Sequence, residues 1–206
     1  MALYIGAAEE RIKVDVDLSG INAGVRHGVA HKDMVVLHET VSPDYPGKGE
    51  LVANAAYLAK GGLGIHAVVD AEGYLGWDYG HRKSILYHTA SNGGGNINTR
   101  SIGIEQVSRV MLDYPDNARR WKKWWSRNAE IDKVAQLLAF LSKTEHIPLV
   151  YSDGTKPGIT THWQITKTYN VSGGHVDCWP KHLGGYYPVL RVIREAQAYY
   201  AKWYLT

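Results

Sequence analysis

Side chains that commonly bind metal ions recur in three separated stretches of this 206-residue sequence. His38 ends an apolar run, His162 follows two threonines, and Asp177 and Cys178 lie in the stretch 173–180, which contains Gly and Pro. Two imidazole nitrogens with one carboxylate oxygen or thiolate sulfur form a usual protein ligand set for a catalytic zinc ion, which keeps a further position for water. No His-Glu-x-x-His signature is present, so a zinc site has to be assembled from distant parts of the chain.

The run Met34–Leu37 is the element expected to position the first of these residues. Four consecutive apolar side chains suit a strand that is buried on both faces, and Ser42-Pro43 breaks it. Such a strand would hold the His38 ring rigidly at the edge of a sheet. A strand-end histidine can instead be a structural side chain bonded to a neighbouring carbonyl, and only the combination with the other two stretches favours metal binding.

The remaining hydrophobic patterns predict a mixed α/β fold. Apolar residues at helical spacing predict helices over 51–59, over 131–141 with Asn128 as N-cap, and from Pro188 to 203. Strands are predicted at 64–70, 74–77, 84–88 and 101–107, the first two forming a hairpin. We therefore expect one domain over residues 1–206 with a mixed central β-sheet flanked by helices, an N-terminal arm at 1–33 and an inserted segment at 108–128.

The predicted strand at 101–107 carries a carboxylate on a defined face. Its residues alternate with period two, which places Ile102 and Ile104 on one face and Gly103 and Glu105 on the other. The stretches around His162 and Asp177 are expected to be loops.

Composition describes an ordinary globular protein with a mildly basic charge. Hydrophobic residues make up 45% and the formal net charge is +3, which fits an anionic polymer as partner without indicating one. The segment Arg119–Trp125 mixes cations with tryptophans, and it either touches such a polymer or is a solvated helix face with its tryptophans turned inward. One cysteine excludes an internal disulfide, and neither a secretory signal nor a run of ~20 apolar residues is visible.

Five segments, in order along the chain, resemble the zinc-dependent N-acetylmuramoyl-L-alanine amidase family, which includes phage endolysins and peptidoglycan recognition proteins. Residues 36–40, Val-Leu-His-Glu-Thr, resemble the opening strand of the family, and residues 64–73 resemble its hairpin. Tyr87-His88-Thr89-Ala90 resembles its Trp-His-Ala-Gly stretch, and residues 98–105 resemble its Asn-x-x-Ser-Ile-Gly-Ile-Glu segment. The stretch ending at Pro180 is similar to the Lys-x-Asp-Pro-Gly or Lys-x-Cys-Pro that closes the site.

The resemblance implies a role for each matching residue. His38 and His162 would bind one Zn²⁺ per chain together with Asp177, or alternatively with Cys178, because the chain has both residues where the family has one. His175 would replace the family's lysine beside the developing oxyanion, and Glu105 would be the general base. His88 would contact substrate or support a ligand, and Asn98 would contact substrate. Ile65 stands where some members have a catalytic Tyr, which favours the mechanism that uses Glu105.

The implied function is hydrolysis of the amide bond between N-acetylmuramic acid and L-alanine in bacterial peptidoglycan, as in an endolysin. A cytosolic amidase of muropeptide recycling and a non-catalytic peptidoglycan-binding module are the alternatives. We expect a monomer that is made in the host cytoplasm without a signal peptide and acts on the cell wall after release. Neither nucleic-acid binding nor membrane insertion is expected.

Overall fold

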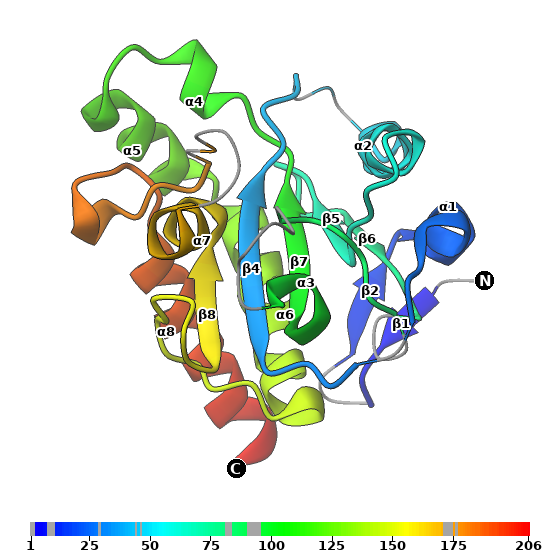
Figure 1. The fold of residues 1–206 in the computed structure, drawn as a ribbon. Helices are drawn as coiled ribbons and strands as arrows, with labels where there is room; N and C mark the ends of the chain where they lie inside the picture. Colours follow the sequence, from blue (N-terminus) through cyan, green and yellow to red (C-terminus); the bar gives the residue numbers. More distant parts are fainter. Residues whose placement is uncertain are drawn as a thin grey trace.

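A six-stranded mixed sheet with helices on both faces forms the body of the computed structural model (Figure 1). The structure describes residues 3–7, 11–28, 30–43, 45, 47–80, 84–89, 96–170, 175 and 177–206. The strands are β1 (Leu3–Ile5), β2 (Ile12–Val14), β3 (Val16–Asp17), β4 (Met34–Glu39), β5 (Ala67–Val69), β6 (Leu75–Trp77), β7 (Ser101–Gln106) and β8 (Gly158–Thr161). The helices are α1 (Ser19–Asn22), η1 (Ala23–Val25), α2 (Gly49–Lys60), α3 (Ile97–Arg100), α4 (Val110–Asp113), α5 (Asn117–Ser126), α6 (Asn128–Glu145), α7 (His162–Tyr169), η3 (Lys181–Leu183) and α8 (Val189–Tyr204).

Strand order explains why the apolar run before His38 is buried on both faces. The six strands follow the order β3-β6-β5-β7-β4-β8, so β4 lies between two parallel neighbours. All six β4 residues are buried, as expected for a parallel strand that is covered on both sides. The predicted hairpin is β5–β6, which pairs antiparallel and makes the sheet mixed. The predicted fold class is confirmed.

The two faces of the sheet are covered by different helices. On the back, the long helices α6 and α8 pack on a core that includes Val35, Leu37, Ile102 and Ile104 (Figure 1). On the front, α3 and α7 cover Met34 and Val36, and α2 covers the strands nearer β5 (Figure 1). The predicted alternation in the β7 strand is confirmed, because Ile102 and Ile104 face the back while Gly103 faces the front, next to the His88 ring.

Four local predictions are corrected by the structure. The expected loop around His162 is the junction of β8 and α7, and the predicted strand at 84–88 is not a strand. The backbone N–H of His88 donates instead to the side chain of Asn98, which replaces a neighbouring strand as its partner. The hairpin strand begins at Ala67 rather than residue 64. Asn128 is the first residue of α6, not its cap, and its side chain accepts from Arg191.

The segment 108–126 forms α4 and α5 beside the carboxyl end of the sheet (Figure 1). Trp124 is fully buried and packs edge-to-face on Tyr187, which anchors α5 to the back core. Trp125 is half exposed, and it stacks on Trp121. The tryptophans therefore divide between core and surface. Among the helices that the structure describes, none is long and apolar enough to cross a membrane.

Candidate metal centre and active site

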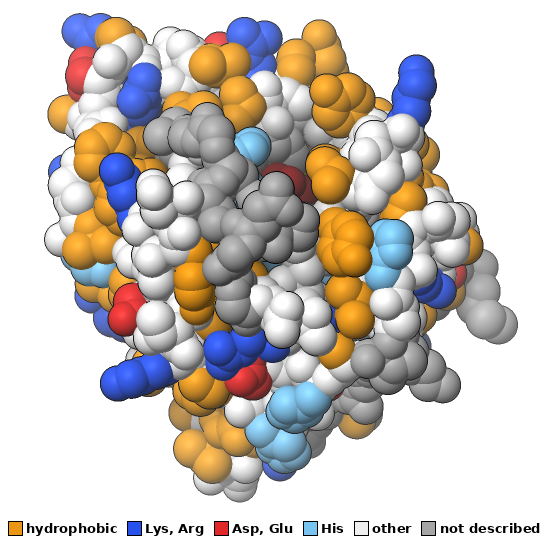
Figure 2. Space-filling model, in the orientation of Figure 1, with side chains coloured by type: hydrophobic (Ala, Val, Ile, Leu, Met, Phe, Trp, Pro, Cys, Tyr) orange, Lys and Arg blue, Asp and Glu red, His pale blue; other side chains and the backbone are white. Residues whose placement is uncertain are grey.

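The carboxyl ends of three adjacent strands bring the predicted ligands and the predicted base to one place. His38 is the penultimate residue of β4, and its Cα pairs with that of Glu105 on β7. His162 follows β8 directly and begins α7, whose N-cap is Thr161. The Thr161 side chain accepts a hydrogen bond from Gln164 N–H, so the strand ends and the helix begins at the imidazole. In the space-filling view of this face, imidazole and carboxylate surfaces lie in a hollow between hydrophobic side chains (Figure 2).

Three ligand atoms converge at the carboxyl ends of these strands, at the spacing of a tetrahedral metal site. His38 Nδ1 lies 3.2 Å from His162 Nδ1, and Asp177 Oδ2 lies 3.1 Å from His162 Nδ1 and 3.6 Å from His38 Nδ1. Zinc bonds of about 2.0–2.1 Å place tetrahedral ligand atoms roughly 3.3–3.4 Å apart. The buried group of His38, His162 and Asp177 could therefore hold a metal ion without a large rearrangement.

The surroundings of His38 and Asp177 favour neutral imidazole and ionised carboxylate, the forms of these two side chains that bind metals. Burial lowers the pKa of His38 to about 4. Burial alone would raise the pKa of Asp177, but the neighbouring rings of His162, His175 and His38 outweigh burial and hold the pKa well below its usual value.

The alternative ligand, Cys178, lies on the other side of the sheet. Its side chain is fully buried in the back core, and its Sγ is 3.7 Å from Gln106 Nε2. Burial raises the pKa of the thiol well above its usual value, which opposes formation of the thiolate that binds metals. Asp177 faces the front because the chain turns sharply here, with Cys178 at a φ of 54°.

Glu105 has the surroundings of a proton acceptor. Its side chain is 8% exposed, and Oε2 makes no hydrogen bond within the described part of the chain. Burial, followed by the charges of Asp177 and Glu39, raises its pKa well above the usual value. A carboxylate that has a raised pKa and is poorly solvated binds a proton more readily at neutral pH.

His175 covers the outer side of the ligand group. Its ring stacks on that of His162 with centroids 4.5 Å apart, and its Nδ1 is 3.7 Å from Asp177 Oδ1. The side chain is 58% exposed, so a bound molecule could reach it. Asp177 raises the pKa of His175, which favours the cationic imidazole.

His88 and Asn98 are both buried beneath the ligand group. Each ring nitrogen of His88 has a protein partner, His38 on one side and Ser101 on the other. Asn98 Oδ1 accepts from the backbone N–H groups of His88 and Thr89, and its Nδ2 donates to Thr89 O. Contact of either residue with substrate stays a prediction.

Comparison with known proteins identifies the family. The model of the N-acetylmuramoyl-L-alanine amidase family matches residues 29–178, which contain all the site residues described above. The chain belongs to this amidase family. Such an enzyme hydrolyses the bond between N-acetylmuramic acid and L-alanine in peptidoglycan. A search of curated proteins finds no significant match.

Solved structures share the fold of this amidase at low sequence identity. The Staphylococcus aureus hydrolase AmiA, in complex with its ligand, aligns with a TM-score of 0.57 and 16% identity over 85% of this chain and 80% of its own. The endolysin LysCS from Clostridium intestinale URNW aligns with a TM-score of 0.54 and 12% identity over 88% and 94% of the two chains. A mutant endolysin from Bacillus subtilis gives 0.51 and 19% over 86% and 91%.

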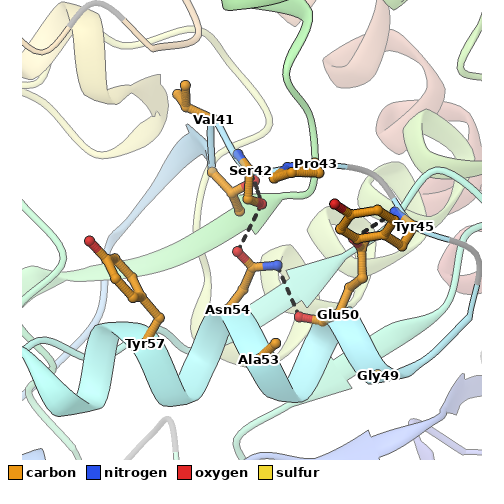
Figure 3. A pocket seen from close by; sticks show the side chains of 10 residues that line it. Val41, Ser42, Pro43, Tyr45, Gly49, Glu50, Ala53, Asn54 and Tyr57 are labelled. Carbon is orange, nitrogen blue, oxygen red and sulfur yellow. Dashed lines mark hydrogen bonds between the residues drawn. The ribbon is translucent and has the colours of Figure 1, made fainter.

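The amidase has a pocket of about 640 Å³, and Thr40, two residues beyond His38, is the first residue along the chain that lines it (Figure 3). It lies between the loop after β4 and the outer face of α2, and its lining residues are Thr40, Val41, Ser42, Pro43, Tyr45, Gly49, Glu50, Ala53, Asn54 and Tyr57. Ser42 Oγ donates to Asn54 Oδ1 at 2.9 Å, and Tyr45 N–H donates to Glu50, which ties the loop to the helix (Figure 3). Tyr45 and Tyr57 are 64% and 80% exposed.

This pocket was not predicted from the sequence. Its lining residues belong to the loop after β4 and to α2. The hydrophobic pattern of α2 predicts only which side of the helix is buried, whereas the pocket is on the other side. The excess of Tyr over Phe was the one available signal, since exposed tyrosines suit a wet binding surface.

Proposed function

We propose that this amidase uses one Zn²⁺, held by His38, His162 and Asp177, to hydrolyse the amide bond between N-acetylmuramic acid and L-alanine. The spacing of the three ligand atoms, 3.1 to 3.6 Å, is the observation that carries the proposal. When bound at this position, zinc supplies Lewis acidity that lowers the pKa of a water molecule and polarises a carbonyl.

In this proposal Glu105 transfers the proton and His175 stabilises the negative charge that develops during the reaction. Glu105 accepts a proton from the attacking water while the new C–O bond forms, and it returns that proton to the leaving amine of L-alanine as the C–N bond breaks. Its raised pKa supports this role, because a general base works best when its pKa lies near the working pH. His175, exposed at the rim of the group, is placed to stabilise the negative charge on the carbonyl oxygen.

The pocket beside α2 is the proposed place for the part of peptidoglycan next to the scissile bond. It is lined by Thr40, two residues beyond the proposed ligand His38, and this closeness along the chain supports its assignment to the polymer next to the scissile bond. Exposed Tyr45 and Tyr57 offer flat apolar faces with hydroxyl groups, which suit sugar rings and peptide. An endolysin-like role in cell-wall lysis follows if the enzyme accepts the intact polymer.

The test combines metal content with identification of the bond that breaks. The purified protein would be analysed for bound metals, stripped with a chelator and reloaded with zinc, and each form incubated with intact peptidoglycan. We expect about one zinc per chain, as a single three-ligand site requires. New L-alanine amino termini should appear without new reducing sugars, and chelation should abolish them.

Each other outcome removes a specific part of the proposal. Zinc binding without cleavage would indicate a peptidoglycan-binding module. Absence of zinc would show that the ligand group does not serve as a zinc site. Cleavage of soluble muropeptides with no action on intact peptidoglycan would replace the endolysin role with muropeptide recycling.

A further inference from the structure

A chain of hydrogen bonds runs from the back of the His38 ring, away from the ligand group, to the start of α3. His38 Nε2 is 3.0 Å from His88 Nδ1, and His88 Nε2 is 3.0 Å from Ser101 Oγ. Ser101 Oγ is in turn 2.6 Å from the carbonyl oxygen of Ile97. All three side chains are buried, so water does not compete along this relay, which we define as His38–His88–Ser101–Ile97.

The carbonyl at the end of the relay fixes the direction of every bond in it. A carbonyl oxygen only accepts, so the single hydroxyl hydrogen of Ser101 must point at Ile97. Ser101 Oγ therefore accepts from His88, which must carry its hydrogen on Nε2. His88 is buried, and its ring hydrogen-bonds His38 and Ser101 rather than a carboxylate, so a second hydrogen would leave a buried positive charge without a counter-charge. The ring therefore holds one hydrogen, on Nε2, and Nδ1 is bare.

The last step reaches the atom that faces the ligand group. A bare Nδ1 on His88 must accept, so His38 donates from Nε2 and its own neutral ring has a lone pair on Nδ1. This is the His38 atom that lies 3.2 Å from His162 Nδ1 and 3.6 Å from Asp177 Oδ2. We propose that His88 and Ser101 are positioning residues that hold His38 in the tautomer able to bind the metal.

The surroundings of His88 are built to keep this ring in place. A Cβ on Gly103 would lie 2.6 Å from His88 Cγ and 2.7 Å from its Nδ1, so only glycine leaves room for the ring. Asn98 Oδ1 accepts from the backbone N–H of His88 at 3.0 Å. Lys32 Nζ donates to the carbonyls of Asn98 and Thr99, which fastens α3 beneath the relay. His162 has no such support, since its Nε2 makes no hydrogen bond within the described residues.

The proposal rests on the proposed metal site and assigns functions to two residues that would not touch the metal. Groups that orient a metal-binding histidine typically change metal affinity by about 10–100-fold when they are removed. We therefore expect Ser101→Ala to weaken zinc binding by roughly that factor, because both tautomers of His88 then become accessible.

Ser152 offers a matched control for Ser101. Both serines are buried, and each donates at 2.6 Å to a backbone carbonyl four residues away, Ser101 to Ile97 and Ser152 to Lys156. Loss of a buried serine hydroxyl should lower the stability of both variants, whereas only Ser101→Ala should lower zinc affinity. Affinity would be measured by competition with a chromophoric zinc chelator, with unfolding midpoints of the metal-free proteins as the readout of stability.

Equal zinc affinity in Ser101→Ala and Ser152→Ala would overturn the proposal. Gly103→Ala adds a second variant, whose new Cβ would press on the His88 ring and on Ile65 while every hydrogen-bonding group is kept, and it should weaken zinc binding in the same way. If Gly103→Ala does not fold, the wild-type protein still decides the question by nuclear magnetic resonance.

The ¹⁵N shifts of the histidine rings in the metal-free protein report the tautomers directly. His38 and His88 should both carry hydrogen on Nε2 and have bare Nδ1 atoms, and a hydrogen on Nδ1 of either ring would refute the relay. This measurement also separates the two proposals, because the tautomers can be read even if the protein binds no zinc. Failure of zinc binding with the expected tautomers would count against the metal site alone.

Discussion

Two polar clusters lie on opposite faces of the same strands and are built from neighbouring residues of the chain. His38, Glu105 and Asp177 belong to the front cluster, whereas the residues that follow each of them, Glu39, Gln106 and Cys178, belong to the back cluster. Each cluster therefore contains a carboxylate and side chains that can bind metals or protons. Within the described part of the chain, only the front cluster brings three potential metal-ligand atoms within 4.8 Å of one another.

The polar side chains of the back cluster are paired with neighbouring groups by hydrogen bonds. Glu39 Oε1 accepts from Ser108 Oγ and from Met111 N–H, and its Oε2 accepts from Tyr186 at 2.8 Å. Tyr187 donates to Gln106 Oε1 at 2.7 Å. These contacts join β4 and β7 to α4 and to the loop before α8, so this cluster stabilises the fold.

Saturation with hydrogen bonds, rather than the type of side chain, separates the two clusters. In the back cluster each carboxylate oxygen of Glu39 has a donor. In the front cluster Glu105 Oε2 has none among the described residues, and the Nδ1 atoms of His38 and His162 face one another. A bound cation would be stabilised by two ring nitrogens and the Asp177 carboxylate, which converge here. In the proposed mechanism the front cluster is therefore the reactive one.

The largest expected effect separates Asp177 from Cys178. Asp177→Ala should lose zinc binding and reduce peptidoglycan hydrolysis to background, because the third ligand is removed. Cys178→Ser should retain zinc at wild-type stoichiometry, since its side chain lies in the back core. Metal analysis of both proteins tests the comparison, and loss of zinc from Cys178→Ser would assign the ligand to the thiol.

Glu105→Gln tests the base with the ligand group intact. The amide fills nearly the same volume but cannot accept the proton, so we expect kcat to fall by about 10²–10⁴-fold. Zinc content should stay at the wild-type value. A variant with full activity would show that another group takes the proton.

Tyr186→Phe tests the structural nature of the back cluster. Removing this donor leaves one oxygen of buried Glu39 without its partner, so the free energy of unfolding should fall by about 1–3 kcal/mol. Urea denaturation of the metal-free protein would measure this change. Zinc affinity should be unaffected, and a fall in affinity that exceeds the loss of stability would mean that the two clusters are coupled through β4.

A smaller, pH-dependent effect is expected from Lys32, the buried cation beneath the front cluster. Burial lowers its pKa to about 8 from the ordinary value of 10.5, so between these pH values the unfolded chain binds more protons than the folded one. Stability should therefore rise with pH in this window, with a slope of up to about 1.4 kcal/mol per pH unit. The difference in unfolding free energy between wild type and Lys32→Met isolates this slope. Parallel pH curves for the two proteins would contradict it.

Several features followed from the sequence because they depend on local pattern. The apolar run 34–37 predicts a strand that has to be buried on both faces, and β4 is such a strand. The alternation through Ile102 and Ile104 places Glu105 on the opposite face, since side chains of a strand alternate. Apolar residues at helical spacing predict a helix over 51–59, and α2 spans Gly49–Lys60.

Other features depend on contacts between distant segments. The choice between Asp177 and Cys178 could not be made from spacing, because adjacent residues differ only in the direction that the backbone gives them. The partners of His88 are 50 residues back and 13 residues ahead in the chain, so no local pattern could predict a relay. The β8–α7 junction was missed for a related reason, since its short strand is stabilised by pairing with β4.

The sequence by itself determined which side chains are available for metal chemistry and on which face of its strand one of them, Glu105, would lie. Tertiary structure alone decided which of those side chains lie close together and which have their donors and acceptors occupied by hydrogen bonds. The physical reason is that strand and helix patterns are set by neighbours in the chain, whereas saturation of a buried donor or acceptor is set by whatever the fold packs against it.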